Sequence, residues 1–189
     1  MLFSDIRGFT SRAEEMSPEQ AVEFLNDYFE NMSDVVAHNE GTVDKFIGDG
    51  MMVLFGATKE DPFQEEHAVR AALEMQQRLL TMTERLPKGD RPLQIGVGIH
   101  SGLAVVGRIG SRRKMDFTAI GDTVNVASRL ESLTKELHAD ILLSEATYDA
   151  LKHAVVVRPN GAVAIKGRVH PVGIYAVESM RKADFAKVQ

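Results

Sequence analysis

The sequence predicts a single α+β domain in which helices pack on one face of a mainly antiparallel sheet, as in the ferredoxin-like and polymerase-palm sandwiches. Three observations support this fold class. The 189 residues, 44% of them hydrophobic, are enough for one sizeable core. The hydrophobic pattern changes repeatedly between the helical period of 3.6 and the strand period of 2. The resulting elements follow the order strand, helix, two strands, helix, strand, with short elements added after them.

The first half of the chain is predicted to contain a strand, a long helix and a hairpin. Residues 1–6 are mostly apolar and lead into a polar, glycine-containing turn, which is typical of a strand end. The segment SPEQ at 17–20 combines an N-cap serine, a proline at the first helical position and a glutamine that completes a capping box. Apolar residues then recur with helical spacing. Two strands, 42–47 and 51–55, are expected around the turn GDG at 48–50.

The second half is predicted to alternate helices with short strands. A helix over 63–85 is ended by PKGD at 87–90, and a second hairpin is expected to join 93–100 to 103–109. Asp122 is the expected N-cap of the next helix. The other expected elements are strands over 116–119, 140–143, 154–158, 162–166 and 172–178, and helices over about 122–137 and 145–151.

These elements are expected to form one domain over residues 1–178, followed by a charged, flexible tail over 179–189. Because residues 1–3 already have the character of a strand, we expect the first strand to be truncated and the chain to be part of a longer protein.

The composition excludes several classes of function. A formal net charge of −5 argues against a general nucleic-acid binder, which usually carries a basic excess. The absence of cysteine excludes disulfides and thiolate metal sites. No apolar run approaches the ~18 residues of a membrane span, and charged residues close to the N-terminus argue against a signal peptide.

Two aspartates are candidate ligands for divalent cations. Asp5 ends the first strand, and Asp49 lies between two glycines in the first hairpin. Strand ends that meet at one edge of a sheet can bring such carboxylates together, and Mg²⁺ or Mn²⁺ would relieve their repulsion. Asp-Gly is also a common hairpin signal, so Asp49 taken alone is equally well explained as a turn residue.

Two segments are candidate phosphate binders. Gly8, Phe9 and Thr10 follow the first strand and begin a helical turn, whose backbone N–H groups can hold a phosphate. Residues 108–114 concentrate positive charge in an otherwise acidic chain. A plain strand–helix turn and a solvated loop are the alternative interpretations of these segments.

Other polar side chains lie within predicted elements. Asn125 and Arg129 are four residues apart and share a helix face that suits a triphosphate or a sugar, although an exposed Asn/Arg pair is also ordinary. Regular alternation would place Lys45 on an apolar strand face and Asp44 on the opposite one. A lysine on such a face either extends to solvent or meets a ligand. Lys166 is equally compatible with plain surface charge.

Three longer segments resemble the signature segments of class III nucleotidyl cyclases, and among these the adenylate cyclases. They are FSDIRGFT at 3–10, DKFIGDGMMVLFG at 44–56 and FTAIGDTVNVASRLE at 117–131, and the resemblance extends from residue 2 to about 178. It implies conversion of ATP to 3′,5′-cyclic AMP and pyrophosphate with two divalent cations, Mg²⁺ or Mn²⁺.

The resemblance also implies roles for individual residues. Asp5 and Asp49 match the metal-binding aspartates, and Ile6 matches the residue whose backbone carbonyl binds one ion. Lys45 and Thr118 match the pair that reads the purine, and these two side chains suit adenine rather than guanine. The remaining matches are Asn125 and Arg129, for the ribose and the transition state, and Arg113 and Lys166, for phosphate contacts.

Further implications concern assembly and regulation. The resemblance implies a head-to-tail homodimer with two shared sites. We expect the catalytic domain to be cytoplasmic, and the parent protein could be membrane-attached. One subunit would supply Asp5, Asp49 and Arg113, and the other Lys45, Thr118, Asn125, Arg129 and Lys166. Threonine at 118 resembles a subgroup that is often stimulated by bicarbonate. A guanylate cyclase, or an inactive cyclase-homology module for dimerisation or ATP sensing, remains an alternative.

Overall fold

The computed structural model describes residues 1–165 and 170–181. The strands are β1 (Leu2–Ile6), β2 (Thr42–Ile47), β3 (Gly50–Leu54), β4 (Ile95–Ile99), β5 (Val105–Gly110), β6 (Met115–Ile120), β7 (Ile141–Ser144), β8 (Val155–Val163) and β9 (Val172–Met180). The helices are α1 (Phe9–Ala13), α2 (Pro18–His38), α3 (Gln64–Glu84), α4 (Asp122–Glu136) and α5 (Glu145–Leu151).

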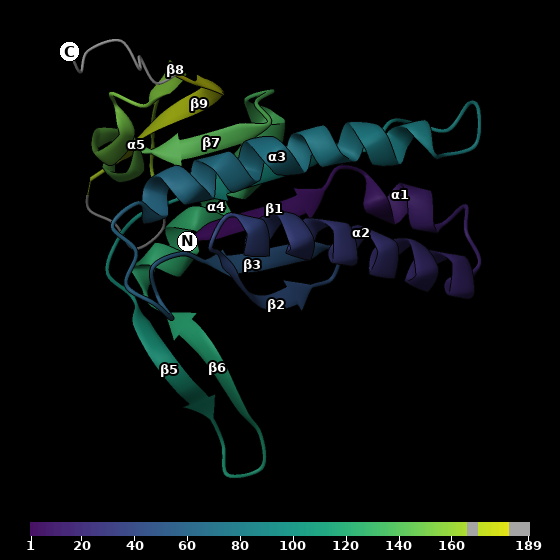
Figure 1. Ribbon diagram of the computed structural model, residues 1–189, viewed down its shortest axis with the longest axis horizontal. Helices are drawn as coiled ribbons and strands as arrows, with labels where there is room; N and C mark the ends of the chain where they lie inside the picture. The colour runs from purple at the N-terminus through teal and green to yellow at the C-terminus, as the bar shows by residue number, and fades with distance from the viewer. Residues whose placement is uncertain (166–169, 182–189) are drawn as a thin grey trace, which may run out of the picture.

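Seven of the strands form one sheet in the order β2-β3-β1-β4-β7-β9-β8 (Figure 1). Its strand pairs are antiparallel except for β4 and β7, which are parallel. A separate two-stranded sheet of β5 and β6 projects from this body (Figure 1). The mainly antiparallel sheet with packed helices confirms the predicted α+β class.

Helix α2 forms where the sequence predicts it, because its first turn carries the predicted cap. The Ser17 side chain accepts a hydrogen bond from the Gln20 backbone N–H, and the Ser17 N–H donates to the Gln20 side chain at 2.8 Å. The capping box therefore gives hydrogen-bond partners to the backbone N–H groups of Ser17 and Gln20, which have no partner within the helix. Helix α3 also agrees with the predicted range within one residue at each end.

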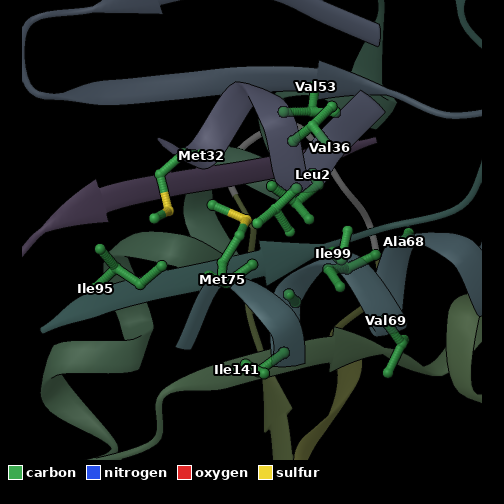
Figure 2. Packing of buried hydrophobic residues seen from close by; sticks show 14 of the residues in the cluster. Leu2, Met32, Val36, Val53, Ala68, Val69, Met75, Ile95, Ile99 and Ile141 are labelled. Atoms are coloured by element: carbon green, nitrogen blue, oxygen red, sulfur yellow. The ribbon is translucent and has the colours of Figure 1, made fainter. Parts of the chain in front are cut away.

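The helices cover both faces of the sheet, whereas the sequence predicted helices on one face. Helices α2 and α3 enclose the main core against β1, β3 and β4 (Figure 2). Ile95, Val97 and Ile99 of β4 point into this core, so the alternating residues Gly96 and Gly98 face the other way. There the backbone of α4 approaches the sheet closely, because neither glycine carries a Cβ.

Gly98 supports a prediction about stability. A Cβ at Gly98 would collide with backbone atoms of Glu131 and Ala127 in α4. We expect Gly98→Ala to lower the free energy of unfolding by about 2 kcal/mol or more, as overpacking of a core does. Gly107→Ala is the matched control, since a Cβ at Gly107 meets nothing within 4 Å. Denaturant unfolding of both variants measures the difference, and equal stabilities would contradict the close packing of α4.

The second predicted hairpin is wrong. β4 pairs with β1 and β7 in the centre of the large sheet, and β5 pairs with β6 instead. The observed hairpin therefore joins Val105–Gly110 to Met115–Ile120 through residues 111–114. The physical reason is burial: every residue of β4 is buried, as in a central strand, whereas every residue of β5 is partly or fully exposed.

Smaller differences concern the ends of elements. Gly121 rather than Asp122 is the N-cap of α4, since Asp122 is already the first helical residue. Gly121 has no side chain, so it makes no side-chain cap bond. The segments predicted as strands over 154–158 and 162–166 are one strand, β8, bent by two register shifts. β9 extends to Met180, and residues 182–189 of the predicted tail lie outside the described residues. No helix among the described residues has the length and apolar character to cross a membrane.

Candidate active site

Asp5 and Asp49 meet at one end of the sheet. Asp5 lies near the end of β1, and the β2–β3 turn carries Asp49 beside it because β1 pairs with β3. Gly50 permits this approach: a Cβ there would lie 2.8 Å from the Ser4 carbonyl oxygen and 3.0 Å from Asp5 Oδ1. Burial, the charge of Asp49 and a hydrogen bond with Asp49, in that order of size, together raise the pKa of Asp5 to about 6.

This arrangement fits a divalent cation. Two carboxylates that repel each other are stabilised by a cation between them, and Mg²⁺ and Mn²⁺ prefer oxygen ligands. Ile6 is buried in the core and its side chain is a hydrocarbon, so its backbone carbonyl is the group that could bind a cation. The described residues contain no group of three or more His, Cys, Asp or Glu side chains placed to hold a metal. Asp5 and Asp49 are the two predicted ligands that the structure brings together here.

The raised pKa of Asp5 leads to a prediction for the metal-free protein. A carboxyl whose pKa is higher in the folded than in the unfolded state is favoured in its protonated form by folding, so its ionisation destabilises the fold. This penalty grows as the pH rises from about 4 to about 6 and is fully present above that window. In EDTA at pH 7.5, Asp5→Asn should therefore raise Tm by about 2–4 °C.

The difference between Asp5→Asn and wild type should shrink as the pH is lowered toward 4.5. The exposed Asp149→Asn is the control for loss of one negative charge. A lower Tm for Asp5→Asn than for wild type at pH 7.5 would show that Asp5 ionisation does not oppose folding.

A third carboxyl near this pair was missed by the sequence analysis. Glu131 of α4 lies over Gly96, with its Oε1 3.2 Å from the position of a Cβ at Gly96, and Gly96 pairs with Asp5. Burial and then the charge of Asp5 raise the pKa of Glu131 to about 7, while Ser132 and Arg7 act in the opposite direction. No local sequence pattern indicates Glu131 as a site residue, because only the close packing of α4 on β4 brings it near the aspartates.

The turn after β1 leads directly into a short helix. Gly8 is the N-cap of α1 and has a φ of 68°, a left-handed conformation that glycine adopts readily. The Phe9 ring stacks on Phe24 at 5.9 Å between centroids, and Thr10 is exposed. The side chain of Phe9 therefore anchors the turn, and the N-terminal N–H groups of α1 are the part of this segment that can face an anion.

Lys45 and Thr118 lie close together through Asp44, a residue to which the sequence analysis gave no role. The Thr118 hydroxyl donates a hydrogen bond of 2.7 Å to Asp44 Oδ2, and Lys45 Nζ lies 3.5 Å from the same oxygen. Regular alternation would put Lys45 and Asp44 on opposite faces of β2, but the pairing with β3 shifts register between Val43 and Lys45. This bulge interrupts the alternation, so that the two neighbouring side chains meet.

Among the described residues, the remaining predicted site residues Asn125, Arg129 and Arg113 are exposed. Asn125 and Arg129 lie one turn apart on α4. Arg113 lies in the turn of the β5–β6 hairpin, which extends away from the large sheet and so from Asp5 and Asp49 of the same chain (Figure 1). Lys166 lies outside the described residues. One chain thus brings together two groups, Asp5 with Asp49 and Lys45 with Thr118, and leaves Arg113 apart from the aspartates.

The fold and these residues define a nucleotide cyclase domain. Residues 1–179 match the family of adenylate and guanylate cyclase catalytic domains, and the chain belongs to that family.

Two similar proteins are named as adenylate cyclases. The chain is 39% identical over 183 residues to adenylate cyclase 1 of Rhizobium meliloti, and 37% identical over 187 residues to an adenylate cyclase of Anabaena cylindrica. The alignments cover 96% and 95% of this chain but only 28% and 36% of those relatives.

Solved structures agree with this assignment. The adenylyl cyclase CyaB from P. aeruginosa has a TM-score of 0.87 and 39% identity, with 96% of this chain and 93% of that chain covered. The guanylyl cyclase Cya2 has a TM-score of 0.88 and 38% identity, with 97% and 93% covered. Overall similarity therefore does not separate the two nucleotide specificities.

Proposed function

We propose that this chain is the catalytic domain of an adenylate cyclase, which converts ATP to 3′,5′-cyclic AMP and pyrophosphate. The observation that carries the choice of ATP is the pair Lys45 and Thr118, held together through Asp44. The Lys45 ammonium is a donor and suits an acceptor nitrogen of the adenine ring, whereas the Thr118 hydroxyl can accept from the adenine amino group. The relatives from Rhizobium meliloti and Anabaena cylindrica named above are adenylate cyclases.

The chemistry needs no protein nucleophile. Asp5, Asp49 and the Ile6 carbonyl would hold two divalent cations, Mg²⁺ or Mn²⁺. Bound there, the cations would lower the pKa of the ribose 3′-hydroxyl and neutralise charge on the triphosphate. The 3′-oxygen attacks the α-phosphorus in line, and the bond from that phosphorus to the pyrophosphate oxygen breaks.

The chain's own residues would position the substrate for that attack. Asn125 would orient the ribose, and the guanidinium of Arg129 would stabilise charge that develops on the α-phosphoryl group. Arg113, Lys166 and the N–H groups at Gly8, Phe9 and Thr10 would hold the remaining phosphates and the departing pyrophosphate.

We further propose that two copies of the chain share each site. Arg113 lies in the turn of the β5–β6 hairpin, which projects away from the large sheet (Figure 1), so we infer that it contacts a triphosphate bound at the aspartates of another copy. The hairpin that carries Arg113 exposes large apolar side chains, which a second copy would cover. They are Val105 (65% exposed), Met115 (55%), Phe117 (52%) and Ile120 (49%).

Turnover of ATP and GTP, measured against protein concentration in Mn²⁺, tests the function. An adenylate cyclase should release cyclic AMP and pyrophosphate from ATP, with a specific activity that rises as dimers form. Preference for GTP would establish the guanylate cyclase alternative. Binding of ATP and Mg²⁺ without pyrophosphate release at high protein concentration would establish an inactive module.

Two finer features complete the proposal. Thr118 supports membership of the subgroup that responds to bicarbonate, and the same assay with and without bicarbonate tests it. A cytoplasmic location is proposed because the substrate is cellular ATP.

A further inference from the structure

Asp44 is the buried link between the two residues that the proposed function assigns to the purine. Its side chain is 1% exposed, whereas that of Lys45 is 38% exposed. Oδ2 of Asp44 receives the Thr118 hydroxyl and lies beside the Lys45 ammonium, and Oδ1 is buried with no hydrogen-bond partner among the described residues. Burying a carboxylate is unfavourable unless it is paired. A buried aspartate with one unpaired oxygen at position 44 therefore indicates a functional role.

The hydrogen bond fixes the direction in which Thr118 can interact with a base. A threonine hydroxyl has one hydrogen to donate and two lone pairs that accept. When the hydrogen is donated to Asp44, only the lone pairs remain for a ligand. The adenine amino group donates to such an acceptor, whereas the 6-oxygen of guanine is itself an acceptor and meets no donor there.

Asp44 also fixes the position of the Lys45 side chain. The ion pair holds the ammonium beside Thr118 and so keeps the donor and the acceptor in fixed relative positions. The bulge in β2 is what allows Asp44 to contact both, since regular alternation would separate it from Lys45.

We propose that Asp44 is a positioning residue that determines specificity: it keeps the Thr118 hydroxyl as an acceptor and the Lys45 ammonium as its neighbouring donor, and so selects adenine over guanine. The inference rests on the proposed function of Lys45 and Thr118 and adds the residue through which they act together.

The test is the ratio of kcat/KM for ATP to that for GTP, measured in Mn²⁺. Asp44→Leu keeps the branched shape of the side chain but has no acceptor, so Thr118 becomes free to donate to guanine. We expect the ATP/GTP ratio to fall about tenfold or more, as loss of a hydrogen bond to a charged group would give. Asp44→Asn keeps an oxygen that can accept from Thr118 and should retain most of the preference. A general folding defect would lower both activities and leave the ratio unchanged.

A second set of variants measures the coupling. In a Thr118→Val background the hydroxyl is absent, so Asp44→Leu should change the ratio much less than it does in wild type. If Asp44→Leu does not fold, Asp44→Ala, which leaves room for water, carries the same expectation. The exposed Asp149→Leu should leave the ratio unchanged.

The outcomes separate this inference from the proposed function. Wild type that prefers ATP, together with Asp44→Leu that keeps the wild-type ratio, overturns the role of Asp44 alone. Wild type that prefers GTP or turns over neither nucleotide overturns the proposed function, and the role of Asp44 with it.

Discussion

Asp49→Ala is expected to abolish formation of cyclic AMP, with kcat/KM reduced by about a thousandfold or more, as loss of strong transition-state stabilisation would give. Asp49 is proposed to share a cation site with Asp5. Burial raises the pKa of Asp5, and the charge of Asp49 and a hydrogen bond with it act in the same direction. Without Asp49 only one side-chain ligand remains, so the 3′-hydroxyl and the triphosphate lose the charge that activates and holds them.

The first measurement is release of pyrophosphate and cyclic AMP from ATP at saturating Mn²⁺. The second is calorimetric titration of the protein with Mn²⁺, which measures binding of the cation. The exposed Asp149→Ala serves as the matched control. Substantial residual formation of cyclic AMP by folded Asp49→Ala would refute the assignment of the two aspartates to the cations.

Mixing two inactive variants should restore activity. Asp5→Ala removes a cation ligand, and Asn125→Ala removes the residue proposed to orient the ribose. If each site takes the aspartates from one chain and Asn125 from the other, a heterodimer of these variants contains one intact site and one doubly damaged site. Random exchange of equal amounts should then give about a quarter of wild-type activity, from heterodimers that make up half of the dimers.

Each variant assayed alone is the control for this experiment, and a mixture of Asp5→Ala with Asp49→Ala is its negative counterpart. Those two changes fall in the same half of the site, so their mixture should stay inactive. If the mixture of Asp5→Ala with Asn125→Ala gains no activity although both chains fold and exchange subunits, the sites are not shared in the proposed way.

The sequence by itself determined the elements whose signals are local. The capping box at Ser17 and Gln20 depends on neighbouring residues, and it gave the start of α2 correctly. The strand-like hydrophobic period on both sides of the turn at Gly48 and Asp49 is also a local signal, and it predicted the first hairpin correctly. The motif segments gave the family, because long runs of residues in a fixed order carry more information than any single position.

Pairing between distant segments was decided only by the tertiary structure. The stretch 95–99 reads as a strand, but its partners, β1 and β7, lie far away in the chain, and the expected hairpin with the following strand was therefore wrong. Glu131 reaches the vicinity of Asp5 only because Gly96 and Gly98 allow α4 to pack closely on β4.

The contact between Asp44 and Thr118 is the clearest case, since it joins residues 74 positions apart. The residue types at positions 45 and 118 were sufficient to suggest adenine, because a donor and an acceptor can be read from side-chain chemistry alone. The sequence could not indicate which way the threonine hydroxyl points. That direction depends on a bulge in β2 and on the fold that brings β6 beside it, and both arise from long-range packing.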